Sequence, residues 1–362
     1  MRDGLDEVVV TATELSAVDG GSGRLIVRGA DIEDLAGRTS YEAMAERLWA
    51  GLAPAGPTAP ESTPLGTPDF GPARLQAWRL APDLLRAARG LPPVDGLRAG
   101  LALLPDGADA HVRVCAAIPV FAAALSRQAR GLAPVPPDPT LGQAADFLRM
   151  LHDKAPETVA VAALETYLVT IADHGMNAST FAARVIASTR AGVVAAVVGA
   201  LCALQGRLHG GAPGPVLDML DAIGSEEAIG PWIEGALDRG ERLMGFGHRV
   251  YRSRDPRADI LKGVVQRLAA QAPERIALAA AVEQAALAAL GARHPDRALA
   301  TNVEFYTALA LEALAIPRDL FTPTFALGRA LGWCAHAFEQ TRGGRLIRPQ
   351  SRYVGPWPVA AA

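Results

Sequence analysis

The sequence predicts a mainly α-helical protein, and three observations support this class. Half of the 362 residues are hydrophobic but only 5% are aromatic, so alanine and leucine dominate the apolar set, which favours closely packed helices. Apolar residues recur at helical spacing over most of the chain beyond residue 73, with glycine- and proline-rich breaks between the runs. One hairpin signal near the N-terminus is the main indication of a sheet.

The predicted hairpin lies within residues 8–29. Two short β-rich runs, VVVTAT at 8–13 and GRLIVRG at 23–29, flank the turn sequence DGGSG at 19–23. Aspartate and glycine at such a position supply the backbone conformations that tight turns require. The sequence therefore predicts a small N-terminal β hairpin ahead of the helices.

The first helix is predicted to begin at a capping box over Thr39–Glu42 and to end at Trp49, with Gly51 as its terminator. Residues 53–72 are rich in Pro, Gly, Ser and Thr, which is typical of a surface loop. Helical patterns then resume and continue through about residue 130.

Residues 141–205 are predicted to be nearly all helix. Gly175 and Asn177 interrupt the helical period, so His174 is expected at a helix end or bend rather than in mid-helix. Asn177 or Ser179 can cap the helix that follows.

The C-terminal part is predicted to contain several shorter helices within residues 215–315, followed by one long helix from Thr322-Pro323 to about Gln340. A glycine-rich break at 206–212 puts His209 on a loop. The tail beyond the last helix is extended and basic.

Composition excludes several classes of function. The formal net charge of −3 gives no attraction toward nucleic acid or a membrane. The longest uncharged apolar run, 191–204, is shorter than a membrane span and reads as a buried core helix. Cys115, Cys202 and Cys334 lie in apolar stretches without metal-ligand spacing, so we expect buried thiols in a reducing cytoplasm and no metal. The acidic N-terminus lacks a signal-peptide core.

The stretch MGFGHRVYRSRDPRADILK at 244–262 carries the densest chemistry. Gly245 and Gly247 leave backbone N–H groups open to a ligand, and His248 follows directly. Asp255-Pro256 predicts the start of a helix. Four arginines lie in this stretch: Arg249, Arg252, Arg254 and Arg257. A cationic cluster at a helix N-terminus suits a substrate with several carboxylates or phosphates. The alternative is a solvated basic turn.

Three of the seven histidines, His174, His209 and His248, lie in glycine-punctuated loops. A single loop histidine is more often incidental than catalytic, but three of them, each near a glycine and amid helices, favour a catalytic set. Glu304 is the best candidate for a base, since an apolar first turn would raise its pKa; the alternative is a plain first-turn glutamate favoured by the helix dipole. The remaining histidines are interpreted as structural or solvated: His111, His152, His294 and His336.

Several motifs occur in a defined order: DHGMNASTFAARVIAS, LHGGA, MGFGHRVY…DPRA, NVEFY and RLIRP…YVG, preceded by AVDGGSGRLIVRGADIEDLAG. Over essentially the whole chain, this set resembles the citrate synthase family in its short bacterial type. The resemblance implies a mostly helical two-domain homodimer. A large domain would comprise residues 1–209 and 316–362, and a small domain, 210–315, would close over the active site.

The resemblance also implies an activity: acetyl-CoA, oxaloacetate and water would give citrate and CoA through an enol and citryl-CoA. Glu304 matches the family's base, which removes a proton from the acetyl methyl group. His209 matches the histidine at the thioester carbonyl. His248 matches the histidine that polarises the ketone of oxaloacetate.

The remaining matched residues would bind the substrates. His174, Arg257 and Arg329 match residues that hold oxaloacetate, and Arg348 would reach the partner's site across the dimer interface. Coenzyme A would lie against Phe246 and Gly247. Arg252 would contact a phosphate of the same molecule. No cofactor is implied beyond the coenzyme A thioester that serves as substrate.

The chain also departs from the family pattern near the substrates. Glu304 stands where the family has aspartate, Pro213 replaces a common asparagine, and Ile171 and Gly175 change HxDHE to IADHG. Three alternatives therefore stay open: a 2-methylcitrate synthase using propionyl-CoA, a weakly active relative that binds CoA or oxaloacetate, and a helical scaffold without a small-molecule site. The motifs do not separate the two synthases, because one methylene shifts specificity by only about 1–3 kcal/mol.

Overall fold

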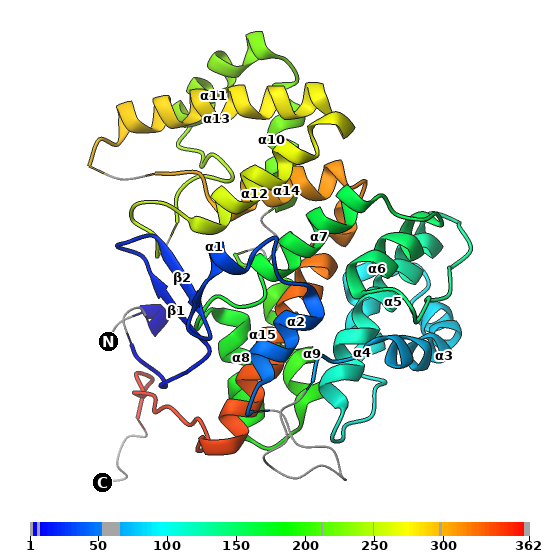
Figure 1. The fold of residues 1–362 in the computed structure, drawn as a ribbon. Coiled ribbons are helices and arrows are strands. Elements are labelled where there is room, and N and C mark those ends of the chain that lie inside the picture. The colour runs from blue at the N-terminus through cyan, green and yellow to red at the C-terminus, as the bar shows by residue number, and fades with distance from the viewer. Residues whose placement is uncertain are drawn as a thin grey trace.

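The computed structural model describes residues 3–5, 8–52, 66–206, 208–210, 213–248, 250–296 and 299–357. Within these ranges the protein is mainly helical and has one small sheet (Figure 1), which confirms the predicted fold class. Most of the predicted loop at 53–72 lies outside the described residues, as does Arg249.

The sheet has three antiparallel strands in the order β1 (Ser16–Asp19), β2 (Arg24–Val27) and β3 (Ala30–Asp31). The predicted second strand is confirmed, but the prediction of a first strand at 8–13 is wrong. The Asp19 carboxylate accepts the N–H groups of Gly21 and Ser22 and closes the turn there, so the residues directly before Asp19 pair with β2.

Nine helices cover the first part of the described chain: α1 (Ile32–Leu35), α2 (Tyr41–Trp49), α3 (Gly71–Ala87), α4 (Pro93–Leu101), α5 (Ala110–Ala129), α6 (Gln143–His152), α7 (Thr158–Thr170), α8 (Ala178–Ser188) and α9 (Val193–Leu204). Six more follow: α10 (Pro213–Ile223), α11 (Ile229–Asp238), α12 (Pro256–Arg267), α13 (Pro273–Arg293), α14 (Val303–Ala313) and α15 (Phe321–Gly343). Short 3₁₀ turns lie at Asp3–Leu5, Glu226–Ala228, Ala269–Gln271 and Arg318–Leu320.

The start of α2 differs from the predicted capping box. Ser40, not Thr39, is the N-cap, and its hydroxyl accepts the Ala43 N–H at 3.1 Å. Glu42 does not close a box, because its carboxylate accepts the Gln143 N–H at 2.8 Å and joins α2 to α6. The predicted terminator is present, with Gly51 at φ 70°.

Helix α15 forms the centre of the larger group of helices and packs against α2, α5, α7, α8 and α9 (Figure 1). Its Trp333, Cys334 and His336 are fully buried. Two buried donors from α2 reach its backbone: Trp49 Nε1 donates to Leu331 O at 3.0 Å, and Tyr41 Oη donates to Leu327 O at 2.9 Å. The rest of the core is therefore built around this helix.

Helices α10 to α14 gather at the top of Figure 1, with α12 against α14, α10 against α14 and α11 against α13. Glu283 of α13 stabilises this group. Its buried carboxylate accepts bonds from Lys262 Nζ, Thr301 Oγ1 and Tyr306 Oη. Helix α12 also contacts α7, so this group borders the larger one.

Two helices, α5 and α13, are long and apolar enough to cross a membrane by length and composition. The apolar window of α5 is 89% buried inside the protein, as in a core helix, whereas that of α13 is 28% buried. The expectation that all cysteines are buried is wrong for Cys202, which is exposed on α9; Cys115 and Cys334 are buried. An apolar neighbourhood in sequence does not tell which side of a helix faces the core.

Candidate active site

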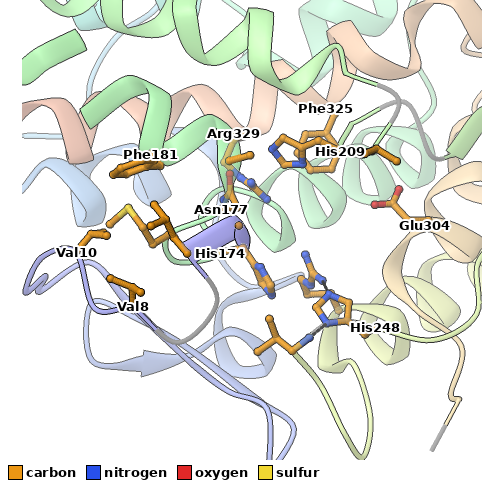
Figure 2. Close-up of a pocket in the computed structure, with 17 residues that line it drawn as sticks. Val8, Val10, His174, Asn177, Phe181, His209, His248, Glu304, Phe325 and Arg329 are labelled. Carbon is orange, nitrogen blue, oxygen red and sulfur yellow. Dashed lines mark hydrogen bonds between the residues drawn. The ribbon is translucent and has the colours of Figure 1, made fainter. Parts of the chain in front are cut away.

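A cavity of about 650 Å³ lies where the two groups of helices meet (Figure 2). Its polar lining consists of six predicted site residues together with Asn177: His174, His209, His248, Arg257, Glu304 and Arg329. Its apolar lining includes Leu5, Val8, Val10, Met176, Phe181, Leu208, Val250 and Phe325. In Figure 2, the Glu304 carboxylate points toward the space between His209 and His248, and Phe181, Val8 and Val10 lie beyond His174.

The tautomer of His248 follows from its contacts. Its Nδ1 accepts the N–H groups of Val250 and Tyr251, both at 3.0 Å, so a neutral ring carries its proton on Nε2. Burial, with a contribution from Arg257, lowers the pKa of His248 to about 4, so the ring is neutral at pH 7. Its Nε2 lies 3.2 Å from Arg257 Nη2, and two donors cannot bond each other. The Nε2–H therefore has no acceptor among the described residues and can donate to a ligand that enters the cavity.

Arg257 is held in the cavity wall by Asp255. The Asp255 carboxylate caps α12 by accepting the Arg257 N–H and also pairs with the guanidinium through Nε at 3.0 Å and Nη2 at 2.8 Å. It further accepts the Val303 N–H at 3.2 Å, which ties the start of α14 to the start of α12. One side chain thus positions both Arg257 and the turn that carries Glu304.

Glu304 occupies the first turn of α14, where Asn302 caps the helix by accepting the Glu304 N–H at 3.0 Å. Its Oε2 is buried and has no hydrogen-bond partner among the described residues. Burial raises the pKa of Glu304 to about 7, although Arg257 opposes the shift. An unpartnered carboxylate with a pKa near neutrality is well suited to abstract a proton.

His209 lies on the turn after α9, as predicted, and its Nε2 is 2.8 Å from Ser179 Oγ. Trp333 Nε1, which can only donate, bonds the same oxygen at 3.1 Å. The Ser179 hydroxyl can donate one hydrogen bond, either to His209 Nε2 or to Asn177 Oδ1. Burial lowers the pKa of His209 to about 4, with a smaller effect of Arg329, so this ring is also neutral at pH 7.

His174 lies between α7 and α8, as the glycine break predicts, and its Nε2 is 3.1 Å from Tyr251 Oη. Burial, together with Arg257 and Arg329, lowers the pKa of His174 well below its usual value. The buried Arg329 donates Nε–H to Ile171 O at 2.6 Å. Its two terminal nitrogens have no protein partner within the described ranges and can bind a carboxylate in the cavity.

Four residues predicted for substrate binding do not line this cavity. Phe246 packs against Phe305, and Gly247 bonds the backbone of Ala300. Arg252 and Arg348 are exposed. Within the described ranges, no cluster of three or more His, Cys, Asp or Glu side chains could hold a metal ion.

Sequence reasoning missed two polar residues that contact the histidines of the site. Tyr251 contacts both His174 and His248, with its ring centroid 4.7 Å from that of His248. Its position three residues after His248, in GHRVY, is the signal that could have identified it. Ser179 was interpreted as a possible helix cap, but Asn177 takes that role and Ser179 contacts His209 instead.

Comparison with known proteins agrees with this geometry. Residues 4–350 match the family described as citrate synthase, C-terminal domain. The citrate synthase of Haloferax volcanii is 39% identical over 98% of this chain and 96% of its own length. The 2-methylcitrate synthase of Mycobacterium tuberculosis is 35% identical over 98% of this chain and 91% of its own length.

Among solved structures, the citrate synthase of Thermoplasma acidophilum, determined as a ternary complex with carboxymethyl coenzyme A and oxaloacetate, superposes with a TM-score of 0.84. It is 27% identical, and the match covers 99% of this chain and 97% of that one. The fold, the order of the motifs and the sequence identity of 39% over nearly the full length lead to the same conclusion: this chain is an enzyme that belongs to the citrate synthase family.

Proposed function

We propose that this enzyme condenses acetyl-CoA with oxaloacetate and water to give citrate and CoA. The observation that carries the proposal is the convergence of an unpartnered Glu304 carboxylate, two neutral imidazoles and two arginines on one cavity. The related structure that holds carboxymethyl coenzyme A and oxaloacetate supports the same substrate class.

Oxaloacetate carries two carboxylates and one ketone, and the cavity offers a donor for each. Arg257 and Arg329 would bind the carboxylates, since both guanidinium groups are buried and line the cavity. The His248 Nε2–H would donate to the ketone oxygen and make the carbonyl carbon more electrophilic. A neutral imidazole can stabilise charge that develops on the ketone oxygen, because the folded protein already holds this donor in place before the reaction.

The acetyl thioester would react on the side of the cavity where Glu304 lies. Ionised Glu304 would take a proton from the methyl group, and His209 would bond the thioester oxygen as it becomes an enolate. If the Ser179 proton bonds His209 Nε2, then Nδ1–H is the donor to that oxygen. The enolate carbon would attack the ketone carbon while the ketone oxygen takes the His248 Nε2 proton, which gives the hydroxyl of citryl-CoA. Water would then split the thioester to citrate and CoA. Each acid–base role contributes about 10²- to 10⁴-fold.

The remaining predictions concern assembly and coenzyme A. We infer a homodimer in which residues 210–315 close over the substrates and Arg348 reaches the partner's site. Half-buried apolar residues on α8 and α9, among them Ile186 and Val198, and the exposed Cys202 beside them support such a contact. Coenzyme A would lie along Phe246 and Gly247, near Arg252. No resident cofactor, nucleic acid or membrane is needed, and the location is expected to be cytoplasmic.

Two alternatives remain testable. Use of propionyl-CoA as a 2-methylcitrate synthase is motivated by the 35% identical relative of that name and by the apolar side chains of Leu208 and Phe325 beside His209. A weakly active relative that binds CoA or oxaloacetate is motivated by the extra methylene of Glu304, because about 1 Å of misplacement can cost about 10²-fold.

The decisive experiment follows thiol release from acetyl-CoA and propionyl-CoA in the presence of oxaloacetate. It compares the wild-type enzyme with Glu304→Gln, Glu304→Asp and the control Glu312→Gln, which changes a glutamate of the same helix that pairs with Arg275 outside the cavity. We expect Glu304→Gln to lose at least about 10²-fold in kcat and the control to stay within about two-fold. Wild type faster with propionyl-CoA would favour the 2-methylcitrate alternative; no release by wild type would favour the binding relative.

A further inference from the structure

The N-terminal hairpin of β1 and β2 contacts both loops that carry the histidines expected at oxaloacetate. The base of the hairpin bonds the segment around His174, and its tip bonds the segment that follows His248. These two segments belong to different groups of helices, so the hairpin connects them through polar contacts.

Ser16, at the start of β1, bonds on both sides of His174. Its hydroxyl donates to Asp173 Oδ2 and accepts the Gly175 N–H at 3.0 Å. Asp173 is buried, and although burial raises the pKa of this carboxyl, His336 and Ser16 keep it below its usual value. The residues before and after His174 are therefore held by one hydroxyl group.

Helix α15 receives the same loop from the opposite side. His336 Nδ1 accepts from Arg184 Nη1 at 2.7 Å, so its Nε2–H donates to Asp173 Oδ1 at 3.2 Å. A Cβ on Gly332 would lie 2.4 Å from Ala172 O, so only glycine lets the loop approach the helix this closely. Ser16 is therefore the last member of a chain of hydrogen bonds that runs from Arg184 through His336 and Asp173.

The tip of the hairpin fits against residues 250–254. Arg252 N–H donates to Gly20 O at 2.9 Å, and Ser253 Oγ donates to Gly21 O at 3.2 Å. A Cβ on Gly20 would lie 2.2 Å from Val250 O, whereas one on Gly21 would meet only Asp19 Oδ1, at 3.4 Å. Val250 and Tyr251 also donate to His248 Nδ1, so this contact bears directly on the ring.

We propose that Ser16 is a positioning residue for the keto-acid site, acting through Asp173 and Gly175 on His174, and that the hairpin tip positions His248 through Val250. The proposal rests on the proposed function in assigning both histidines to oxaloacetate. It assigns the effect of Ser16 to one substrate: loss of the Ser16 bonds weakens oxaloacetate binding and spares acetyl-CoA.

The test compares Ser16→Ala with the conservative Ser16→Thr, which keeps the hydroxyl, and with Ser126→Ala, which removes a buried hydroxyl of α5 that has no partner among the described residues. Steady-state kinetics give the KM for each substrate. Hydrogen exchange of the peptide spanning 171–177 gives loop order without any need for activity. Gly20→Ala and its neighbour Gly21→Ala form a second matched pair at the tip.

Ser16→Ala is expected to raise the oxaloacetate KM by about 10-fold or more, because one bond to a charged group is lost, and to change the acetyl-CoA KM by less than about two-fold. The Gly175 amide should exchange faster, and Ser16→Thr should restore both properties. Gly20→Ala should raise the oxaloacetate KM, while Gly21→Ala and Ser126→Ala should not.

Equal changes in both KM values, or no rescue by threonine, would overturn the positioning role of Ser16. A Gly20→Ala variant that behaves like Gly21→Ala would overturn the role of the tip. If the wild-type enzyme releases no thiol, the proposed function fails, but the exchange of the Gly175 amide still decides whether Ser16 orders the loop.

Discussion

Protonation of individual side chains sets the expected pH dependence. Burial lowers the pKa of both His209 and His248 to about 4 and raises the pKa of Glu304 to about 7. Above pH 5 both rings are neutral, so only the base changes its charge near neutrality. We expect kcat/KM for acetyl-CoA to rise about tenfold per pH unit below 7 and to level off above it. An acidic limb centred near pH 4 would instead point to a base with an ordinary pKa.

Removal of the Glu304 carboxyl group is expected to stabilise the folded protein at alkaline pH. The folded-state pKa of Glu304 is raised from 4.5 to about 7, so the folded protein binds this proton more tightly than the unfolded chain. This tighter proton binding stabilises the folded protein in full below pH 4.5, and the stabilisation is lost as the pH rises through 7. At pH 8, Glu304→Gln should therefore unfold with about 1–3 kcal/mol more free energy than wild type.

Chemical denaturation at pH 8 and pH 4.5 checks this sign. The difference between the Glu304→Gln variant and wild type should shrink toward zero at the lower pH. A variant that is less stable than wild type at pH 8 would contradict a buried, unpartnered carboxylate.

At the element scale, α15 works as the surface against which the His174 loop is fixed. Gly332→Ala would place a methyl group 2.4 Å from Ala172 O and 2.8 Å from Asp173 Oδ1. Because a backbone carbonyl cannot move aside cheaply, we expect a loss of about 2 kcal/mol or more in the free energy of unfolding, together with weaker oxaloacetate binding. Gly343→Ala is the matched control, since a Cβ there meets nothing within 4 Å. Thermal unfolding and titration calorimetry would measure both effects.

Asp255 joins the starts of α12 and α14, so its removal should lower the free energy of unfolding more than removal of an exposed aspartate nearby. Asp255→Ala removes the α12 cap, the acceptor for Val303 N–H and the partner of the buried Arg257. An unpaired buried charge costs about 3–5 kcal/mol, so urea unfolding should show a loss of that size. Asp259→Ala removes only an exposed pair with Arg254 and should cost less than about 1 kcal/mol. Similar losses in both variants would argue against a buried Arg257 charge.

The dimer prediction concerns the whole molecule and can be tested through Cys202. This thiol is exposed on α9, whereas Cys115 and Cys334 are buried. If α8 and α9 form the contact with a second copy, alkylation of Cys202 should slow by about tenfold or more when the protein is concentrated above its dimer dissociation constant. Mass-spectrometric labelling at several concentrations, alongside sedimentation analysis, measures this. A labelling rate independent of concentration in a sedimenting dimer would place the interface elsewhere.

Local patterns in the sequence were sufficient for the helices and for most cavity residues. Asn177 and Asp255 cap the helices predicted for them, because a capping bond spans only two or three residues. Local context made His174, His209, His248 and Glu304 candidates and placed Arg257 in a cationic cluster, whereas Arg329 came from the family resemblance alone. The strand at 8–13 and the capping box at Thr39 failed, because competing local bonds of Asp19 and Ser40 decided the outcome.

Contacts between distant segments could be obtained only from the folded chain. Ser16 bonds residues 157 and 159 positions away, and Trp333 reaches Ser179 across 154 positions. No periodicity encodes such pairs, since each depends on how helices and strands pack. The same holds for the pKa values of His209 and His248, which burial lowers. The raised pKa of Glu304, by contrast, was expected from its apolar first turn and is confirmed. Motifs therefore identified the candidate catalytic groups, and packing decided which residues support them and how strongly their pKa values are shifted.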